Sequence, residues 1–212
     1  MLEQFYEKDK IEVGIDEAGR GCLFGPVCVG AVIWLDEDPI KDDKNYEIKD
    51  SKKVSEKKRT LLKDYIKDNS IAYNIQLIHH NDIDKYNILQ ATLRGMRLCL
   101  DNITDIINID TILIDGNHFD FYSDKNDKYI DHVCVIDGDN IYKSIAAASI
   151  LAKTYRDEWI YKLVDENPEL EKYDLRNNKG YGTKKHLDAI KEYGITKWHR
   201  KSFGICKNIN QN

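Results

Sequence analysis

The sequence lacks the marks of several protein classes. Its five cysteines are odd in number and no two have the Cys-x-x-Cys spacing, which disfavours a zinc site and a redox motif. No apolar run approaches the ~18 residues of a membrane span. The first ten residues do not contain the basic and then apolar segments of a signal peptide. We therefore expect a cytoplasmic protein that does not span a membrane.

Motifs for nucleotide binding and nucleophilic catalysis are also missing. Gly19, Gly21 and Gly25 do not fit the pattern G-x-G-x-x-G, and the chain has no G-K-[ST], so neither an NAD nor an ATP site is supported. No Ser-His-Asp arrangement stands out. His79 and His80 have no metal-ligand spacing to another His or Cys, and we expect them on the surface where a helix begins.

Length and composition favour one globular domain. The chain has 212 residues, of which 42% are hydrophobic and 33% charged, and it contains no internal repeat. We expect residues 1–212 to form a single domain, with an α/β core over about 11–165 followed by a basic part over about 166–212. The acidic segment 36–50 reads as an exposed loop.

Charge is distributed unevenly along the chain. The net charge is −5, yet Arg176 to Lys207 contains nine Lys or Arg residues against two acids. A basic end on an acidic body indicates a metal-needing core joined to a phosphate-facing surface. The plain alternative is a solvated basic face with no ligand.

Hydrophobic periodicity predicts strands that alternate with helices. Gly25-Pro26 joins the first two strands by a short connection and so favours an antiparallel pair. An initial pair of antiparallel strands, followed by strands that alternate with helices, indicates an α/β fold with a mixed sheet. Strands are expected at 11–15, 27–35, 71–78, 111–115 and 130–136. Helices are expected at 56–68, from Asn81 or Asp82 to 103, from about Asn140 through the IAAASILAK segment, and at 183–193 with Gly194 as a stop.

Acidic residues end three of the expected strands. Asp16 and Glu17 end the first strand, Asp115 ends a later one, and Asp137 or Asp139 follows the last. Strand ends in an α/β sheet gather at shared edges, where ligands bind. Converging carboxylates repel one another, and divalent cations relieve that repulsion. A single acid at a strand end is usually a turn former, but three such ends predict a metal site suited to phosphodiester chemistry.

Two glycine-flanked residues are suited to a nucleic acid. Arg20 lies between Gly19 and Gly21, where backbone and guanidinium can both approach a phosphate. Tyr181 lies between glycines in the basic segment NKGYGTKKH, where its ring can stack on a sugar or base. A half-packed turn tyrosine is the alternative. The segment HRKSF at 199–203 is expected to extend the basic surface.

Six segments, in order, resemble those of the ribonuclease HII family, the type 2 ribonucleases H. They are GIDEAGRGCLFGPV, DSKKVSEKKR, LIDGN, IAAASILAKTYRD, NKGYGTKKH and HRKSF, and they extend from about residue 11 to 203. The resemblance implies a ribonuclease H-like fold with a helical C-terminal part. It implies endonucleolytic hydrolysis of RNA in RNA–DNA hybrids and incision at single ribonucleotides in duplex DNA, leaving 3′-hydroxyl and 5′-phosphate ends. Mg²⁺ or Mn²⁺ is the implied cofactor, and ribonucleotide and primer removal are the implied roles.

The resemblance also assigns residues. The implied metal-binding and catalytic acids are Asp16, Glu17, Asp115 and Asp139. Asp139 is chosen over Asp137 because the family's acid lies six residues before the Ile of the IAAAS block, here Ile145. Gly19, Arg20 and Gly21 would contact the ribose 2′-hydroxyl and the adjacent phosphate, and Tyr181 the sugar of the following deoxynucleotide. Weaker candidates for substrate contact are Lys52, Ser149, Lys153, Lys179 and His186.

Two other function classes remain open at this stage. Another carboxylate–metal nuclease, such as a proofreading-type exonuclease, would cut from 3′ ends without regard to ribose. A nucleic-acid-binding module would retain the acids without cleavage. A monomer is the default expectation, and residues 204–212 contain no convincing sliding-clamp-binding peptide.

Overall fold

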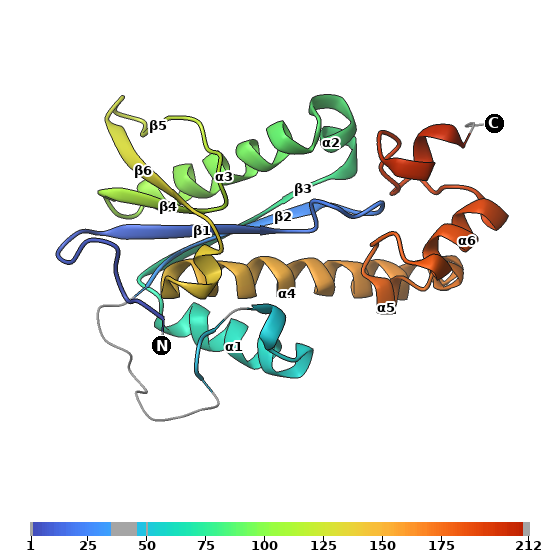
Figure 1. Cartoon of the computed structure of the whole chain (residues 1–212), viewed down its shortest axis with the longest axis horizontal. Helices are drawn as coiled ribbons and strands as arrows, with labels where there is room; N and C mark the ends of the chain where they lie inside the picture. The colour runs from blue at the N-terminus through green and yellow to red at the C-terminus, as the bar shows by residue number, and fades with distance from the viewer. Residues whose placement is uncertain (1, 35–45, 50, 210–212) are drawn as a thin grey trace.

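The computed structural model describes residues 2–34, 46–49 and 51–209, without the side chain of Lys52. Most of the acidic segment predicted at 36–50 therefore lies outside the described residues. Figure 1 shows a central sheet with α1 and α4 on one face and α3 on the other. The strands are β1 (Glu12–Ala18), β2 (Val27–Ile33), β3 (Ala72–Ile78), β4 (Thr111–Asp115), β5 (Tyr122–Ser123) and β6 (Tyr129–Val135).

Helices connect and cover these strands. The α-helices are α1 (Glu56–Asn69), α2 (His80–Tyr86), α3 (Ile88–Thr104), α4 (Lys143–Glu166), α5 (Leu175–Asn178) and α6 (Lys184–Tyr193). Short 3-10 helices are η1 (Ser51–Lys53), η2 (Gly138–Asn140), η3 (Pro168–Tyr173) and η4 (Gly204–Asn208). No helix in the described part of the chain is long and apolar enough to cross a membrane.

The sheet is mixed, as the sequence predicts. Its strand order is β3-β2-β1-β4-β6-β5. The expected antiparallel pair of β1 and β2 is confirmed, and β1 also pairs in parallel with β4, which pairs in parallel with β6. Because β1, β4 and β6 run the same way, their carboxyl ends lie at one edge, where the predicted acids are located.

Helix α4 packs on the sheet at very close range. A Cβ added to Gly14 of β1 would lie 2.4 Å from the backbone nitrogen of Ile145, and one added to Gly30 of β2 would lie 2.5 Å from the carbonyl oxygen of Ala148. Glycines on the strands and alanines on the helix together allow this approach. The contact fixes the height of α4 relative to β1, and thereby what faces the acids.

Three details differ from the sequence prediction. The long helix expected to 103 is two helices, because Asn87 adopts a positive φ of 69° and its side chain accepts a hydrogen bond from the N–H of Gln90 at the start of α3. His79, not Asn81 or Asp82, is the N-cap residue of α2, and His80 is buried there instead of lying on the surface. Strand β5 has only two residues, too few for a periodic signal.

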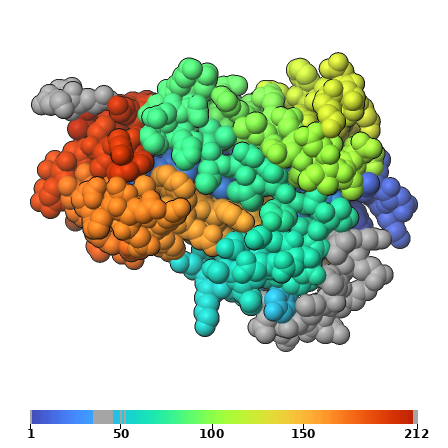
Figure 2. All heavy atoms as spheres, turned by 180° about the vertical axis from the view of Figure 1, so that it is seen from behind, coloured from blue at the N-terminus to red at the C-terminus, as the bar shows by residue number. Residues whose placement is uncertain are grey.

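The C-terminal part has its own apolar cluster against the end of α4. Leu170, Tyr173, Leu175 and Ile190 are buried in it together with Ile160 of α4. Seen from behind, the C-terminal segment also lies beside α2, in red and green respectively (Figure 2). There the carboxylate of Asp84 accepts hydrogen bonds from the backbone N–H groups of Lys201 and Ser202, at 2.9 and 2.8 Å. The C-terminal part is thus held to both the sheet layer and α4.

Candidate active site

Asp16 and Asp115 lie side by side on neighbouring parallel strands. Ile15 pairs with Ile114, so the next residue on each strand is a carboxylate at the same edge of the sheet. Asp16 is 6% exposed, and its Oδ1 accepts a hydrogen bond of 2.6 Å from the backbone N–H of Glu17. Apolar β-branched residues drive the strands into the core, and the acids stand where that core reaches solvent.

Burial raises the pKa of two of these carboxyl groups, Asp16 and Glu17. The pKa of Asp16 lies well above its usual range because of burial, followed by the negative charges of Glu17 and Asp115. Burial also raises the pKa of Glu17, against the opposing effect of Arg20, whose guanidinium lies 3.2 Å from Glu17 Oε1. Such mutual repulsion in a buried site is what a bound cation relieves.

The structure distinguishes the two aspartates that follow β6. Asp139 in η2 is 1% exposed, whereas Asp137 is exposed and has a left-handed φ of 55°. The backbone N–H of Gly138 donates a 2.7 Å hydrogen bond to Asp115 Oδ1, which holds η2 against the end of β4. Asp139 is therefore a buried residue of the turn that contacts the end of β4, and Asp137 is an exposed residue of the same turn.

The donor set suits a divalent cation, although the side chains do not form a closed cluster. Glu17 Oε2 is buried and has no hydrogen-bond partner among the described residues. An orphaned carboxylate oxygen beside two other carboxylates provides the hard oxygen ligands that Mg²⁺ and Mn²⁺ prefer. In their present orientations, no three His, Cys, Asp or Glu side chains within the described ranges form a group that could hold a metal ion.

Ser149 lies behind the acids. It is 6% exposed on α4, its hydroxyl hydrogen-bonds the carboxylate of Asp16, and its Oγ lies 2.9 Å from Oγ of Ser51 in η1. Substrate contact by Ser149 stays a prediction. The close packing of α4 on β1 places its hydroxyl against Asp16, and its contact with Ser51 ties the segment preceding Lys52 to the site.

A buried arginine, Arg200, holds the Gly19-Arg20-Gly21 turn from the protein side. Arg200, fully buried, donates to the carbonyl oxygens of Gly25 at 2.9 Å, Arg20 at 2.8 Å and Gly19 at 2.7 Å. Burial lowers its pKa to about 10, so it remains charged at neutral pH. The partners of this buried cation are thus neutral carbonyl groups, and its hydrogen bonds to them fix the path of the turn.

A second buried arginine, Arg156, joins the residues after this turn to the Tyr181 loop. It is 1% exposed on α4 and donates to the carbonyl oxygens of Pro26, Phe24 and Lys179, at 3.0, 3.1 and 2.8 Å. Its guanidinium carbon lies 5.9 Å from the ring centre of Tyr181, a cation–π contact. One side chain therefore joins the residues that follow the turn to the Tyr181 loop.

The arginines were not among the predicted site residues. The segment HRKSF does not simply extend a basic surface as predicted, because His199 and Arg200 are fully buried. The helical spacing could have predicted the burial of Arg156, since it lies on one face of α4 with the buried residues Ala152 and Ile160. Arg200 has no comparable signal, because its partners are backbone carbonyls.

Tyr181 is presented at the surface by a rigid loop. Tyr181 is 43% exposed, and the preceding Gly180 has a φ of 83°. The backbone N–H of Leu23 donates to the carbonyl of Gly180 at 2.8 Å, which joins the loop to the segment after Gly21. His186 is fully buried beneath this loop. Direct substrate contact by His186 is therefore corrected to a role inside the protein.

The predicted lysines are partly engaged with the protein. Lys153 Nζ lies 3.4 Å from the buried carboxylate of Asp157, one helical turn away. Lys179 Nζ hydrogen-bonds Tyr161 Oη and lies 3.6 Å from Glu56. The side chain of Lys52 lies outside the described residues. Contact of these lysines with substrate stays a prediction.

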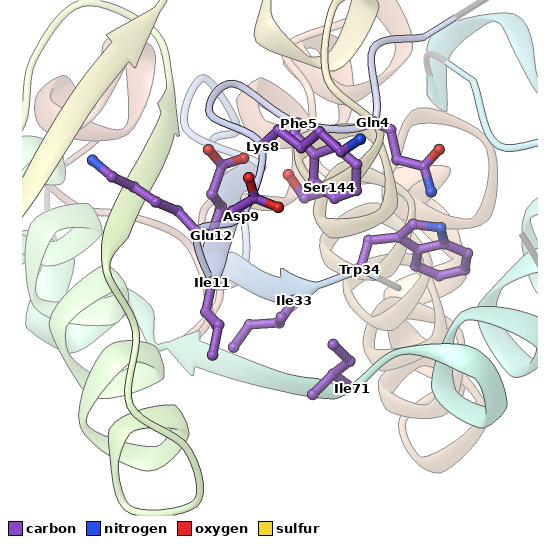
Figure 3. Close-up of a pocket in the computed structure, with 11 residues that line it drawn as sticks. Gln4, Phe5, Lys8, Asp9, Ile11, Glu12, Ile33, Trp34, Ile71 and Ser144 are labelled. Carbon is purple, nitrogen blue, oxygen red and sulfur yellow. The ribbon is translucent and has the colours of Figure 1, made fainter. Parts of the chain in front are cut away.

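A cavity of about 280 Å³ opens directly beside the acids. Glu17, Arg20 and Asp115 form its polar wall, and Leu93 and Met96 of α3 form part of its apolar wall. A separate cavity of about 210 Å³ lies at the other end of β1, near Glu12 and Trp34 (Figure 3). It contains none of the predicted site residues, so the candidate site is the cavity beside Asp115.

Comparisons with known proteins show the family and the fold of this chain. A family model described as Ribonuclease HII matches residues 13–206. The ribonuclease HII of Christiangramia forsetii is 46% identical, over 95% of this chain and 94% of that protein. The ribonuclease H2 from Pyrococcus horikoshii OT3 has a TM-score of 0.73 at 23% identity, over 93% of this chain and 95% of that one. Bst-RNase HIII in complex with Mn²⁺ has a TM-score of 0.70 at 18% identity, over 93% and 68%. The predicted ribonuclease H-like fold is confirmed.

Proposed function

The chain belongs to the ribonuclease HII family and is an endoribonuclease that acts on RNA–DNA hybrids, and from this premise we propose that it also incises duplex DNA at single ribonucleotides. The products are 3′-hydroxyl and 5′-phosphate ends, and the roles are removal of ribonucleotides and primers. The observation that carries this proposal is the cavity in which the half-buried acids Glu17 and Asp115 meet Arg20. It combines a site for phosphodiester hydrolysis with a residue able to read ribose.

Asp16, Glu17, Asp115 and Asp139 would hold the divalent cations, Mg²⁺ or Mn²⁺. When bound, such cations activate a water molecule and stabilise the leaving 3′-oxygen. The chain's own contribution is to supply carboxylates held by their neighbours: Glu17 N–H and the Ser149 hydroxyl orient Asp16, and the N–H of Gly138 orients Asp115. Two of the four carboxylates, Asp16 and Asp115, are thus held by backbone N–H groups or α4, which limits their reorganisation during the reaction.

Gly19, Arg20 and Gly21 would read the ribose 2′-hydroxyl and the adjacent phosphate. The 2′-hydroxyl is the group by which a protein distinguishes RNA from DNA at a given position. The side chain of Arg20 is 49% exposed, while the carbonyls of Gly19 and Arg20 are bonded to Arg200 on the protein side. The turn therefore has a fixed inner side and an open outer side toward substrate.

The two glycines of this turn should respond differently to alanine. A Cβ at Gly19, whose φ is 91°, would lie 2.0 Å from Nε of Arg156, whereas a Cβ at Gly21 meets nothing within 4 Å. Gly19→Ala should destabilise the fold by about 3 kcal/mol, a drop in Tm of about 6–12 °C. Gly21→Ala should keep the wild-type Tm and lose incision activity, because its methyl group faces the substrate. Wild-type activity of Gly21→Ala would contradict close backbone approach.

Tyr181 would stack on the sugar of the deoxynucleotide that follows the RNA. Tyr181→Ala should slow incision at a single ribonucleotide about 10-fold or more, because stacking on one residue contributes ~1–3 kcal/mol. A long RNA–DNA hybrid offers many ribonucleotides in sequence and should lose less. Initial rates on the two duplexes give the comparison. Equal losses on both would contradict the junction role.

The remaining substrate contacts are proposed for Lys52, Lys153 and Lys179, as phosphate contacts along the duplex. We also propose that the protein acts as a monomer in the cytoplasm. The basic residues between Arg176 and Lys207 would add salt-dependent affinity for the duplex.

One incision assay tests the function. A DNA duplex with a single internal ribonucleotide is incubated with Mg²⁺ or Mn²⁺, beside the same duplex made only of DNA. The proposal predicts one cut on the 5′ side of the ribonucleotide and none in the all-DNA duplex. Degradation from 3′ ends without regard to ribose would indicate an exonuclease, and binding without any cut would indicate a binding module.

A further inference from the structure

Two histidines form a buried pair beneath the Tyr181 loop. His186 of α6 and His199 are both fully buried, and their Nε2 atoms lie 3.2 Å apart. Phe24 and Tyr173 pack edge-on against His199, with ring centres 4.9 and 5.1 Å away. The pair is thus enclosed by aromatic rings and is remote from water.

The hydrogen bonds around the pair determine where each proton resides. The backbone N–H of Thr196 donates to His199 Nδ1 at 2.9 Å, so this nitrogen carries no proton. A neutral His199 then holds its proton on Nε2 and donates it to His186 Nε2. His186 must hold its own proton on Nδ1, which lies 2.9 Å from the carbonyl oxygen of Tyr181. Burial lowers the pKa of His199 to about 3, consistent with two neutral rings.

The chain of hydrogen bonds runs in one direction, from Thr196 through both rings to Tyr181. The same carbonyl of Tyr181 accepts a second bond, from the N–H of Thr183 at 2.8 Å. Both acceptor positions of the oxygen are therefore used, and the peptide plane that carries the Tyr181 ring is fixed. An apolar replacement of His186 would leave this buried carbonyl with one partner fewer.

We propose that the His199–His186 pair is a positioning element that sets the orientation of Tyr181, and through it the preference for an RNA-to-DNA junction. The proposal rests on the junction role proposed above for Tyr181. His199 and Arg200 are consecutive residues, and the second holds the carbonyls of Gly19 and Arg20. One dipeptide therefore holds both segments that face the substrate, the ribose-contacting turn and the Tyr181 loop.

Two substitutions of His186 test this chain of hydrogen bonds. Both introduce a polar amide side chain, and they differ in which ring nitrogen the amide replaces. In His186→Asn the amide nitrogen replaces Nδ1 and can still donate to the Tyr181 carbonyl. In His186→Gln the amide reaches the position of Nε2, near His199, and the bond to Tyr181 is lost. The measured quantity is the rate on a single-ribonucleotide duplex divided by the rate on an all-RNA hybrid, below the Tm of both variants. We expect this ratio to fall ~10-fold in His186→Gln and to stay within ~3-fold of wild type in His186→Asn.

A spectroscopic measurement gives an independent answer. Long-range ¹⁵N–¹H spectra of the wild-type imidazoles at pH 7 should show the proton of His199 on Nε2 and that of His186 on Nδ1. Opposite tautomers, a charged ring, or equal ratios for the two variants would overturn the proposal. If the wild-type protein cuts hybrids but not single ribonucleotides, the proposed function fails. The tautomers of His186 and His199 are measured independently of cleavage, so that failure is distinguishable from a failure of the histidine arrangement.

Discussion

Asp16→Asn is expected to abolish incision and, at the same time, to stabilise the metal-free protein at neutral pH. Loss of a proposed cation ligand should reduce the rate at least ~1,000-fold, since changes outside the ligand shell alone cost ~10–100-fold. The gain in stability follows from the raised pKa of Asp16, caused first by burial and then by Glu17 and Asp115. A carboxyl group whose pKa is higher in the folded state stabilises the fold below its unfolded pKa. That contribution is lost as pH rises through the folded pKa.

At pH 7, above the unfolded pKa of an aspartate, the raised folded pKa of Asp16 therefore reduces the free energy of unfolding, and the neutral amide of asparagine removes this cost. Thermal melts in the presence of a chelator should show a higher Tm for Asp16→Asn than for wild type. Added Mg²⁺ should raise the Tm of wild type more than that of the variant. Duplex binding, measured by fluorescence anisotropy, should be largely unchanged. A lower Tm together with lost binding would indicate that Asp16 is structural.

Asp137→Asn provides the matched control. Asp137 is exposed, and asparagine tolerates its left-handed φ of 55° as well as aspartate does. Incision and Tm should both stay at wild-type levels, whereas Asp139→Asn should lose incision. Loss of activity in Asp137→Asn with retention in Asp139→Asn would exchange the roles of the two aspartates.

The strand ends and their acids were predictable because both rest on local pattern. Apolar runs identify the strands around Asp16 and Asp115, and each acid marks where its run stops. The parallel pairing of β1 with β4, which brings the two acids together, follows from the connection through helices. Local sequence periodicity was therefore sufficient to predict the edge of the sheet where the candidate site lies.

The support beneath the site was not predictable in the same way. Arg200 bonds three carbonyl oxygens, and every residue has a carbonyl, so no residue type in the sequence marks the partners. The break at Asn87 depends on one positive φ between two apolar helical patterns. His186 and His199 are polar residues that could equally lie on the surface, and they are buried where their ring nitrogens pair with each other and with backbone groups. Such features depend on contacts between distant segments.

Arg200→Lys should cause the largest loss of stability among the conservative substitutions. Lysine keeps the charge, but one ammonium group cannot reach three carbonyls that a planar guanidinium bonds together. Two lost charge-assisted bonds in the buried site should cost about 3–5 kcal/mol, a fall in Tm of about 10 °C or more. Thermal unfolding of Lys201→Ala, the exposed basic neighbour, serves as the control and should stay near wild type.

The functional consequence should appear before the protein unfolds. With the carbonyls of Gly19 and Arg20 released, the turn loses its fixed inner side, and its discrimination between ribose and deoxyribose should weaken. At a temperature where Arg200→Lys is folded, incision at a ribonucleotide should fall more than duplex binding does, because phosphate contacts elsewhere persist. A variant that melts ~10 °C lower yet incises at the wild-type rate would show that Arg200 stabilises the fold without shaping the turn.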